Sequence, residues 1–153
     1  MSSAAEMIKK VQNGGGKQDT LRLMANKKKP VGAIEPMDVS VVAAKLLVEN
    51  DTAKHNKAKY VLNGPASITG AQIVAMVEER IGSKLDHVVF RDNSMLDEFA
   101  AASPELQHLS ETMKEAADET FDSLLPTVPT SRELLDFAPP KITPASVLEQ
   151  LLK

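Results

Sequence analysis

The feature that most limits how this chain can fold is a helical segment that is apolar on nearly all sides. Between Val39 and Val48, only Ser40 and Lys45 are not apolar. A helix of this kind has to be covered on more than one side, and the short strands expected in the chain are too few to cover it. The sequence therefore predicts an exposed apolar patch, which a partner or a second copy can cover.

We place the centre of this patch at Val39, Val42 and Leu46, and binding of a protein partner or self-association through it is a hypothesis. Asp38 is expected to cap the helix, because its carboxylate can accept hydrogen bonds from the free N–H groups of the first turn. Met37, before this cap, has the spacing to pack on Val42 as a hydrophobic staple.

The segment from Ser67 onward carries the most complete set of helix signals. Thr69 and Gln72 have the spacing of a capping box. Ile68 and Ile73 have the spacing of a staple. Gly82 is placed to end the helix in the left-handed conformation. The sequence therefore predicts a helix that begins after Thr69 and ends at Gly82.

The rest of the chain alternates short strands with helices. We expect strands within residues 30–36, 60–65 and 86–90, and helices over residues 5–12, 95–102, 104–121, 130–137 and 143–152. Ser103 and Pro104 divide the longest helical region, since proline favours the first position of a helix. Thr130 and Glu133 have the spacing of a second capping box. This order predicts an α/β protein rich in helix.

The most glycine-rich stretch, QNGGGKQDT, does not have the spacing of a phosphate-binding loop. A P-loop built on Gly16 requires a glycine where the chain has Val11 and a hydroxyl where it has Gln18. In the dinucleotide pattern G-x-G-x-x-G, the third glycine falls on Asp19. We therefore expect a flexible surface loop rather than a nucleotide site.

Composition excludes several classes of site. The chain has no cysteine, which excludes disulfides, thiol catalysis and cysteine-ligated zinc. The basic cluster NKKKP has no aromatic residue beside it, so we expect no nucleic-acid partner. No signal peptide and no run of about 20 apolar residues is present, so we expect no membrane contact and a cytoplasmic protein.

The order of these motifs resembles the later part of the NmrA-like family, the atypical short-chain dehydrogenase/reductases of the NAD(P)-binding Rossmann superfamily. The similar positions are Ile34, Asp38 and Val39 at the start of an alanine-rich helix, the turn Gly64-Pro65, and the capped helix that ends at Gly82. The resemblance covers residues 31–91, about two fifths of the chain. The terminal segment KITPASVLEQLLK is also similar to the closing helix of the family.

This resemblance implies a helix-rich α/β fold that forms the C-terminal, substrate-side part of a Rossmann-like reductase and lacks the nucleotide-binding half. Residues 1–30 are then an N-terminal helix with a flexible Gly/Lys loop, and residues 31–153 are the NmrA-like C-terminal portion. Full-length relatives carry a G-x-x-G-x-x-G turn for NAD(P), and this chain does not, so we assign it no cofactor. By alignment Met1 resembles an internal methionine, which predicts a truncated product.

We assign no catalytic, cofactor-binding or metal-binding residue to this chain. Family reductases use a tyrosine or lysine of the first half, and the only tyrosine, Tyr60, has Gly64 where the pattern Tyr-x-x-x-Lys requires lysine. We interpret Tyr60 as a packing residue. His55, His87 and His108 are spaced too far apart to indicate a metal site.

Three hypotheses about function follow from the resemblance. The first is the substrate-side segment of an NAD(P)-dependent oxidoreductase, inactive alone, in which Asp38, Gly64 and Pro65 shape the scaffold. The second is a non-catalytic NmrA-like module that binds a regulatory protein partner. The third is a fragment without a separate function.

Overall fold

The computed structural model describes residues 1–14, 19–102, 107–122 and 128–153. Within these ranges the chain is an α/β protein rich in helix, which confirms the expected class. Its elements follow in the order α1 (Ser2–Gln12), β1 (Leu21–Leu23), β2 (Val31–Gly32), α2 (Pro36–Leu47), the 3-10 turn η1 (Ala53–His55), β3 (Ser67–Ile68), α3 (Gly70–Ile81), β4 (Val88–Phe90), α4 (Ser94–Ala102), α5 (Gln107–Asp122), α6 (Arg132–Phe137) and α7 (Pro144–Leu152).

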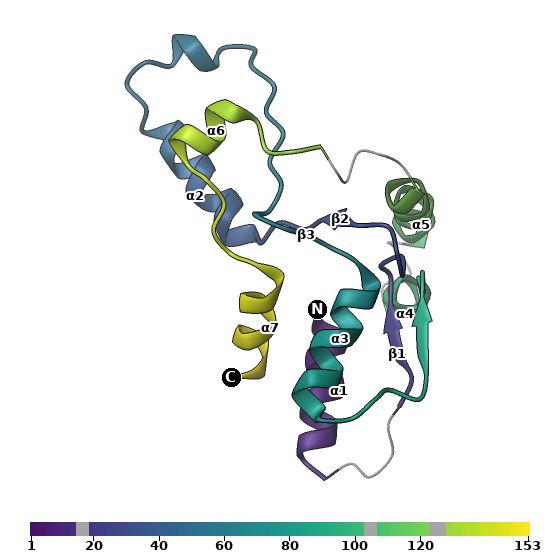
Figure 1. The fold of residues 1–153 in the computed structure, drawn as a ribbon. Helices are drawn as coiled ribbons and strands as arrows, with labels where there is room; N and C mark the ends of the chain where they lie inside the picture. Colours follow the sequence, from purple (N-terminus) through teal and green to yellow (C-terminus); the bar gives the residue numbers. More distant parts are fainter. Residues whose placement is uncertain (15–18, 103–106, 123–127) are drawn as a thin grey trace.

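Two small sheets connect these helices (Figure 1). Strands β1 and β4 pair in parallel, with Leu21 opposite Val88. Strands β2 and β3 pair in antiparallel fashion, with Val31 opposite Ile68. Strands β2 and β4 confirm two of the three expected strands. The sequence did not predict β1, because three residues are too few to show an alternating pattern.

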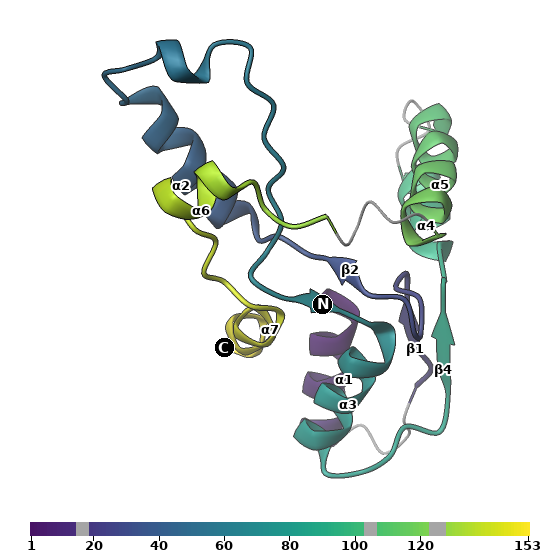
Figure 2. The same ribbon diagram turned by 45° about the horizontal axis from the view of Figure 1, so that its top comes forward.

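The main core lies between α1, α3, α7 and the parallel pair. Helix α1 lies beside α3 in both views, and α7 faces α1 (Figures 1 and 2). The buried side chains of this core come from both sides of residue 30, and they are Ala4, Ala5, Met7, Ile8, Leu21, Leu23, Ala25, Ile68, Ile73, Val77 and Leu148. Residues 1–30 thus share one core with the later helices.

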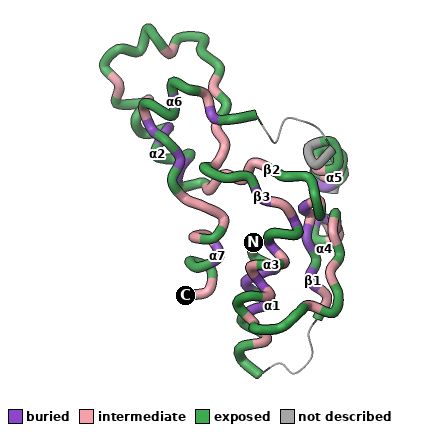
Figure 3. Tube along the Cα trace, viewed as in Figure 1, coloured by how far each residue is buried: buried purple, intermediate pink, exposed green. Residues whose placement is uncertain are grey.

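A second, smaller cluster joins α2 to α6. Val42 of α2 is buried with Leu134 and Ala138, and Leu46, Tyr60, Leu62 and Phe137 pack around them. Figure 3 shows that most of the other residues on α2 and on the connector after it are exposed. The apolar helix identified from the sequence is therefore covered on one side only.

The starts of two helices follow the sequence closely. At α3, the Thr69 hydroxyl accepts from the Gln72 N–H at 3.2 Å, and the Gln72 side chain accepts from the Thr69 N–H at 2.8 Å. Gly82 ends this helix with φ 71°, as expected. Thr143 and Ser146 form an equivalent capping box at α7. These caps act within one helical turn, so residue spacing alone predicts them.

The predicted cap of α2 is wrong. Helix α2 begins three residues earlier than expected, at Pro36, and its N-cap is Glu35, whose carboxylate accepts from the Met37 N–H. Proline at the first position favours this earlier start. The side chain of Met37 is exposed rather than stapled to Val42. Asp38 therefore lies inside the first turn, and its carboxylate is free for another partner.

The strand expected within residues 60–65 is also wrong. This segment is extended, but its hydrogen bonds to residues 128–131 come mostly from side chains and form no strand ladder. One backbone bond runs from the Ser131 N–H to the Val61 carbonyl at 2.9 Å. The Asn63 N–H donates to the Thr130 hydroxyl at 2.9 Å, and the Val61 N–H donates to the Ser131 hydroxyl at 2.9 Å. Because Thr130 is used in this way, the predicted Thr130–Glu133 capping box does not form, and Ser131 is the N-cap of α6.

The division of the long helical region is confirmed by separate helices α4 and α5. The dividing residues Ser103 and Pro104 lie outside the described residues, as does most of the predicted Gly/Lys loop. Among the described helices, none combines the length and the apolar character that a bilayer span needs.

Candidate functional site

The carboxyl ends of β1 and β4 lie at the same edge of the parallel pair, which is where open α/β sheets bind ligands. The chain stays hydrogen bonded beyond both strands. The Asp92 N–H donates to the Leu23 carbonyl at 3.0 Å, and the Arg91 N–H donates to the Ala25 carbonyl at 3.3 Å. Arg91 also holds φ 57°, which is uncommon for a residue with a side chain. Backbone hydrogen bonds therefore hold the turn after β4 against the end of β1 and the residues that follow it.

Asp92 is the most constrained charged group at this edge. Its carboxylate accepts from the Ser94 N–H at 2.9 Å and from the Arg22 guanidinium at 2.7 Å, and its side chain is 7% exposed. The hydrogen bonds from Ser94 hold the pKa of Asp92 below its ordinary value; Arg22 adds to this effect, and burial opposes it. A carboxylate with a lowered pKa is a weak base, so Asp92 does not activate the Ser94 hydroxyl for attack.

A cavity of about 410 Å³ opens beside these groups. Arg22, Asp92, Ser94 and Glu98 line its polar side, and the start of α1 closes it. The Oδ1 atom of the neighbouring Asn93 is buried and has no hydrogen-bond partner among the described residues. The arrangement can orient a polar molecule.

The role of Asp92 predicts a pH-dependent effect on stability. We expect Asp92→Asn to lower the free energy of unfolding by about 1 kcal/mol at pH 7, because a neutral amide oxygen accepts weaker hydrogen bonds from Ser94 than the carboxylate does and the ion pair with Arg22 is lost. The folded-state pKa lies below the ordinary value of 3.8, so the wild-type advantage is complete above that pH and is lost as the pH falls through the lower folded value.

Urea unfolding of both proteins between pH 3 and pH 7 measures this difference. Asp136→Asn, an exposed change on α6, is the control and should leave the free energy of unfolding unchanged at every pH. A difference between wild type and Asp92→Asn that is the same at pH 3 and pH 7 would contradict the assignment.

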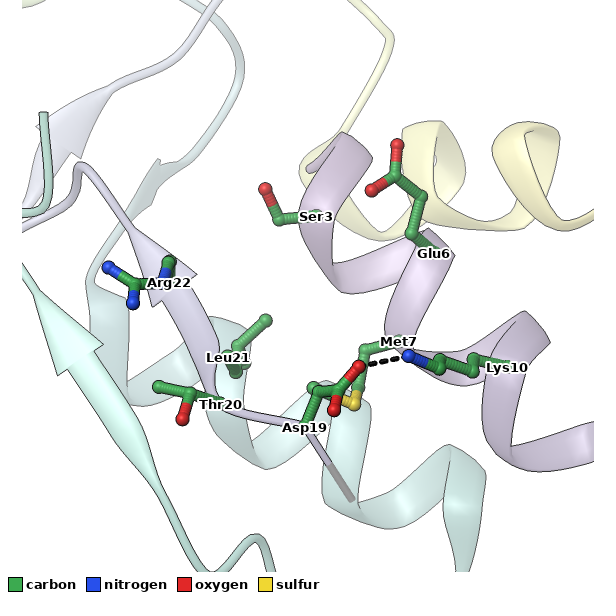
Figure 4. A pocket seen from close by; sticks show the side chains of 8 residues that line it. All are labelled: Ser3, Glu6, Met7, Lys10, Asp19, Thr20, Leu21 and Arg22. Carbon is green, nitrogen blue, oxygen red and sulfur yellow. Dashed lines mark hydrogen bonds and ion pairs between the residues drawn. The ribbon is translucent and has the colours of Figure 1, made fainter. Parts of the chain in front are cut away.

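A second cavity, of about 260 Å³, lies between α1 and β1 (Figure 4). Lys10 of α1 and Asp19, just before β1, form an ion pair across its mouth. Glu6 and Ser3 project from α1 at the other end. Both partners of the ion pair are more than half exposed, and exposed pairs contribute little to binding or stability. This cavity is therefore a weaker candidate than the edge of the parallel pair.

A third cavity, of about 320 Å³, has an almost wholly apolar lining. It lies where the ends of β1 and β2 meet the starts of α2 and α7, and Glu35 is its only ionisable lining side chain. It shares Met1, Ala25 and Ile73 with the polar cavity at the carboxyl edge. The two cavities are therefore neighbours along one side of the main core.

Asp38, the carboxylate singled out in the sequence, has a structural partner far along the chain. Its Oδ2 atom accepts from the backbone N–H groups of Lys141 at 3.0 Å and Ile142 at 2.9 Å. Asp38 is 7% exposed. It thereby fixes the segment before α7 against the first turn of α2. The expected scaffold role is right, but Asp38 fulfils it through these two long-range hydrogen bonds rather than as a helix cap. We call the contact of Asp38 with Lys141 and Ile142 the Asp38 latch.

The turn Gly64-Pro65 also has the expected scaffold role. A Cβ atom on residue 64 would overlap the carbonyl oxygen of Ala33 and would lie 3.0 Å from its carbonyl carbon. Only glycine allows the connector to cross the chain between β2 and α2 so closely. This crossing joins the second cluster to the main core.

Tyr60 is a packing residue, as interpreted, although it is not in a strand. Its hydroxyl is 2.7 Å from Nδ1 of His55, and the His55 ring lies 6.0 Å from the ring of Phe137. The Nε2 atom of His55 is buried without a hydrogen-bond partner among the described residues. His55 therefore belongs to the cluster between α2 and α6. Over the described residues, His, Asp and Glu form no group of three that could hold a metal ion.

The predicted centre of the apolar patch needs correction. Val39 is exposed, but Val42 is buried and Leu46 is half-buried, because α6 and the connector pack on that side of α2. Exposed apolar residues with helical spacing form two neighbouring rows on α2, one of Val39, Ala43 and Leu47 and one of Met37, Val41, Ala44 and Val48. We call the four residues of the second row the α2 stripe.

Sequence reasoning missed the polar residues of the carboxyl edge. Arg22 was not identified because the strand that carries it was not predicted. Asp92 and Ser94 could have been found, because aspartate followed two residues later by a helix start is a common cap. The contact between Asp92 and Arg22 joins residues 70 positions apart, which no local pattern reveals.

Comparison of this chain with family models, with curated proteins and with solved structures gives no match.

Proposed function

We propose that this chain provides the substrate-side part of an NAD(P)-dependent oxidoreductase of the NmrA-like type and does not reduce a substrate by itself. The parallel pairing of β1 with β4 is the observation that carries the proposal. Parallel strands occur almost only in larger sheets whose faces are both covered. Here every residue of β4 is at least partly exposed, and Val89 is 40% exposed. A nucleotide-binding half would supply further parallel strands beside β4 and helices over its exposed side chains.

The turns at the carboxyl edge also support the proposal. A dinucleotide requires a glycine-rich turn after a strand, where the backbone can approach the pyrophosphate. The turn after β1 reads Met24-Ala25-Asn26, and the turn after β4 reads Arg91-Asp92-Asn93. Gly14 follows a helix rather than a strand. These turns do not fit a dinucleotide, so the chain's own contribution is the polar cavity beside Asp92.

The test supplies the nucleotide-binding half in trans. The chain is co-expressed with a separate Rossmann half that carries G-x-x-G-x-x-G, and NADPH oxidation is followed at 340 nm with a panel of quinones and aldehydes. We expect no activity above background for the chain alone, and activity for the co-purified pair. Turnover by the chain alone would overturn the proposal. So would a Rossmann half that neither binds the chain nor gains activity from it.

The second candidate function is protein binding through the α2 stripe. Met37 is 62% exposed, Val41 49% and Val48 78%, and together they present apolar side chains at helical spacing along one side of α2. Such a stripe is the usual contribution of a helix to a partner's groove. This function requires no nucleotide-binding half, which separates it from the first proposal.

Glutamate substitutions in the stripe test this second function. We expect the double change Val41→Glu and Val48→Glu to reduce Nile red binding at least about twofold, since it removes exposed apolar surface. The melting temperature should change by less than about 2 °C, because neither side chain is buried. Leu109→Glu, which places one glutamate on the exposed face of α5, is the control and should keep most of the Nile red binding of the wild type. Unchanged dye binding in the double variant would contradict the role of the stripe.

A further inference from the structure

The apolar cavity of about 320 Å³ has walls that the fold holds in place. The Asp38 latch fixes Ile142 on one side, through two backbone N–H groups. The capping box at Thr143 fixes the first turn of α7 beside it. On the opposite side Val31 pairs with Ile68 between β2 and β3. Because caps and backbone pairs hold these walls, the cavity is preformed, as ligand sites usually are.

The lining predicts an apolar occupant. Isoleucine, valine, alanine, proline and methionine make up the wall except at Glu35. A closed cavity of ~150 Å³ with a similar apolar lining holds one benzene molecule. The present cavity, which opens to solvent, is about twice that size. Its volume therefore fits a two-ring aromatic molecule or an aliphatic molecule of similar bulk.

Two ionisable groups border the cavity. The Glu35 carboxylate already accepts from the Met37 N–H at the start of α2, and Met1 carries the α-amino group, whose pKa is lowered by burial. The rest of the lining is apolar and cannot replace the water around a charged molecule, so a charged occupant loses solvation free energy on entry. A neutral, apolar molecule avoids this loss.

We propose that this cavity is a binding site for a neutral, apolar molecule of about the size of a two-ring aromatic. The site belongs to the chain by itself and does not depend on the proposed reductase partner. None of its lining residues belongs to the α2 stripe, although Pro36 of the lining precedes Met37 of the stripe in the chain. Binding at this site is therefore separable from both proposed functions.

Isoleucine methyl groups give a direct readout of this site. The chain has six isoleucines, and four of them, Ile34, Ile68, Ile73 and Ile142, line the cavity. The other two, Ile8 and Ile81, do not line it, and α2 contains none. In the intact chain labelled at isoleucine δ1 methyls, titration with 2-naphthol should shift the four lining signals together. The expected dissociation constant is of the order of 0.1–1 mM, as for a ligand of this size.

Two comparisons test the volume and the charge of the site. Val147→Phe places a larger side chain into the cavity from α7 and should weaken 2-naphthol binding about tenfold or more. Ala145→Phe also introduces phenylalanine into α7, but at an exposed position outside this lining. This variant should bind 2-naphthol as wild type does. The anion 2-naphthoate has to lose its water shell in the apolar lining, so it should shift the four signals at least about fivefold less at equal concentration.

The wild-type titration decides the proposal by itself. Four lining methyls that do not move, or methyls of Ile8 and Ile81 that move equally, would overturn it. Equal shifts with 2-naphthol and 2-naphthoate would overturn the assignment of a neutral ligand. If the proposed reductase pair fails while the four methyls shift, the site stands without that function.

Discussion

Gly64→Ala is expected to lower the free energy of unfolding by about 4 kcal/mol, and the melting temperature by roughly 10 °C. The added Cβ would overlap the backbone carbonyl of Ala33. The carbonyl belongs to the main chain and the Cβ is fixed to it, so neither can rotate away. The chain around residue 64 or the segment between β2 and α2 has to move. Thermal and urea unfolding of the two proteins measure the loss.

Gly82→Ala is the matched control for Gly64→Ala. Gly82 ends α3 with φ 71°, and a Cβ there meets no atom within 4 Å. The cost is then only that of the left-handed conformation, about 1 kcal/mol. Equal losses for the two variants would show that the close crossing at residue 64 is not what makes glycine necessary there.

Asp38→Ala is expected to lower the free energy of unfolding by about 3 kcal/mol, because two backbone N–H groups lose a charged acceptor. Those groups belong to Lys141 and Ile142, 103 and 104 positions away in the sequence. The loss should be accompanied by faster amide exchange at these two residues. Exchange followed by NMR therefore separates the latch from a general loss of stability.

Asp136→Ala, on the exposed face of α6, is the control for the latch. It should change the free energy of unfolding by less than ~0.5 kcal/mol and leave exchange at Ile142 unchanged. If Asp38→Ala were as stable as wild type and exchanged at the same rate, the carboxylate would not be the element that holds α7 against α2.

The two variants also separate the two parts of the fold. Gly64 controls where the connector crosses the chain between β2 and α2, whereas Asp38 joins α2 to the segment before α7. Both contacts border the apolar cavity, since Ala33 and Ile142 belong to its lining. We therefore expect either change to alter the shape of that cavity as well as the stability of the chain.

Local signals in the sequence predicted the helices of the main core well. The capping box of Thr69 and Gln72, the left-handed Gly82 and the start of α7 at Thr143 all formed as expected. The same reasoning failed at Asp38 and Thr130, which have good local spacing but use their side chains elsewhere. In both cases the competing partner lies far along the chain, at Ile142 and at Asn63.

The candidate site was less accessible to sequence reasoning than the helices. Arg22 and Asp92 meet only because β1 and β4 pair in parallel, and β1 is too short to be recognised by its pattern. The family resemblance and the functions it implies stay predictions, which the co-expression and Nile red experiments address.

The sequence by itself determined where α3 and α7 begin, where α3 ends, and that α2 carries more apolar surface than its neighbours cover. These properties depend on residues within one or two helical turns, where spacing fixes which groups can meet. Only the tertiary structure decided which side of α2 is buried, what Asp38 holds and where the cavities lie. Those outcomes depend on contacts between residues far apart in the sequence, such as Val31 with Ile68 and Asn63 with Val128, and on the competition of each side chain between local and distant partners.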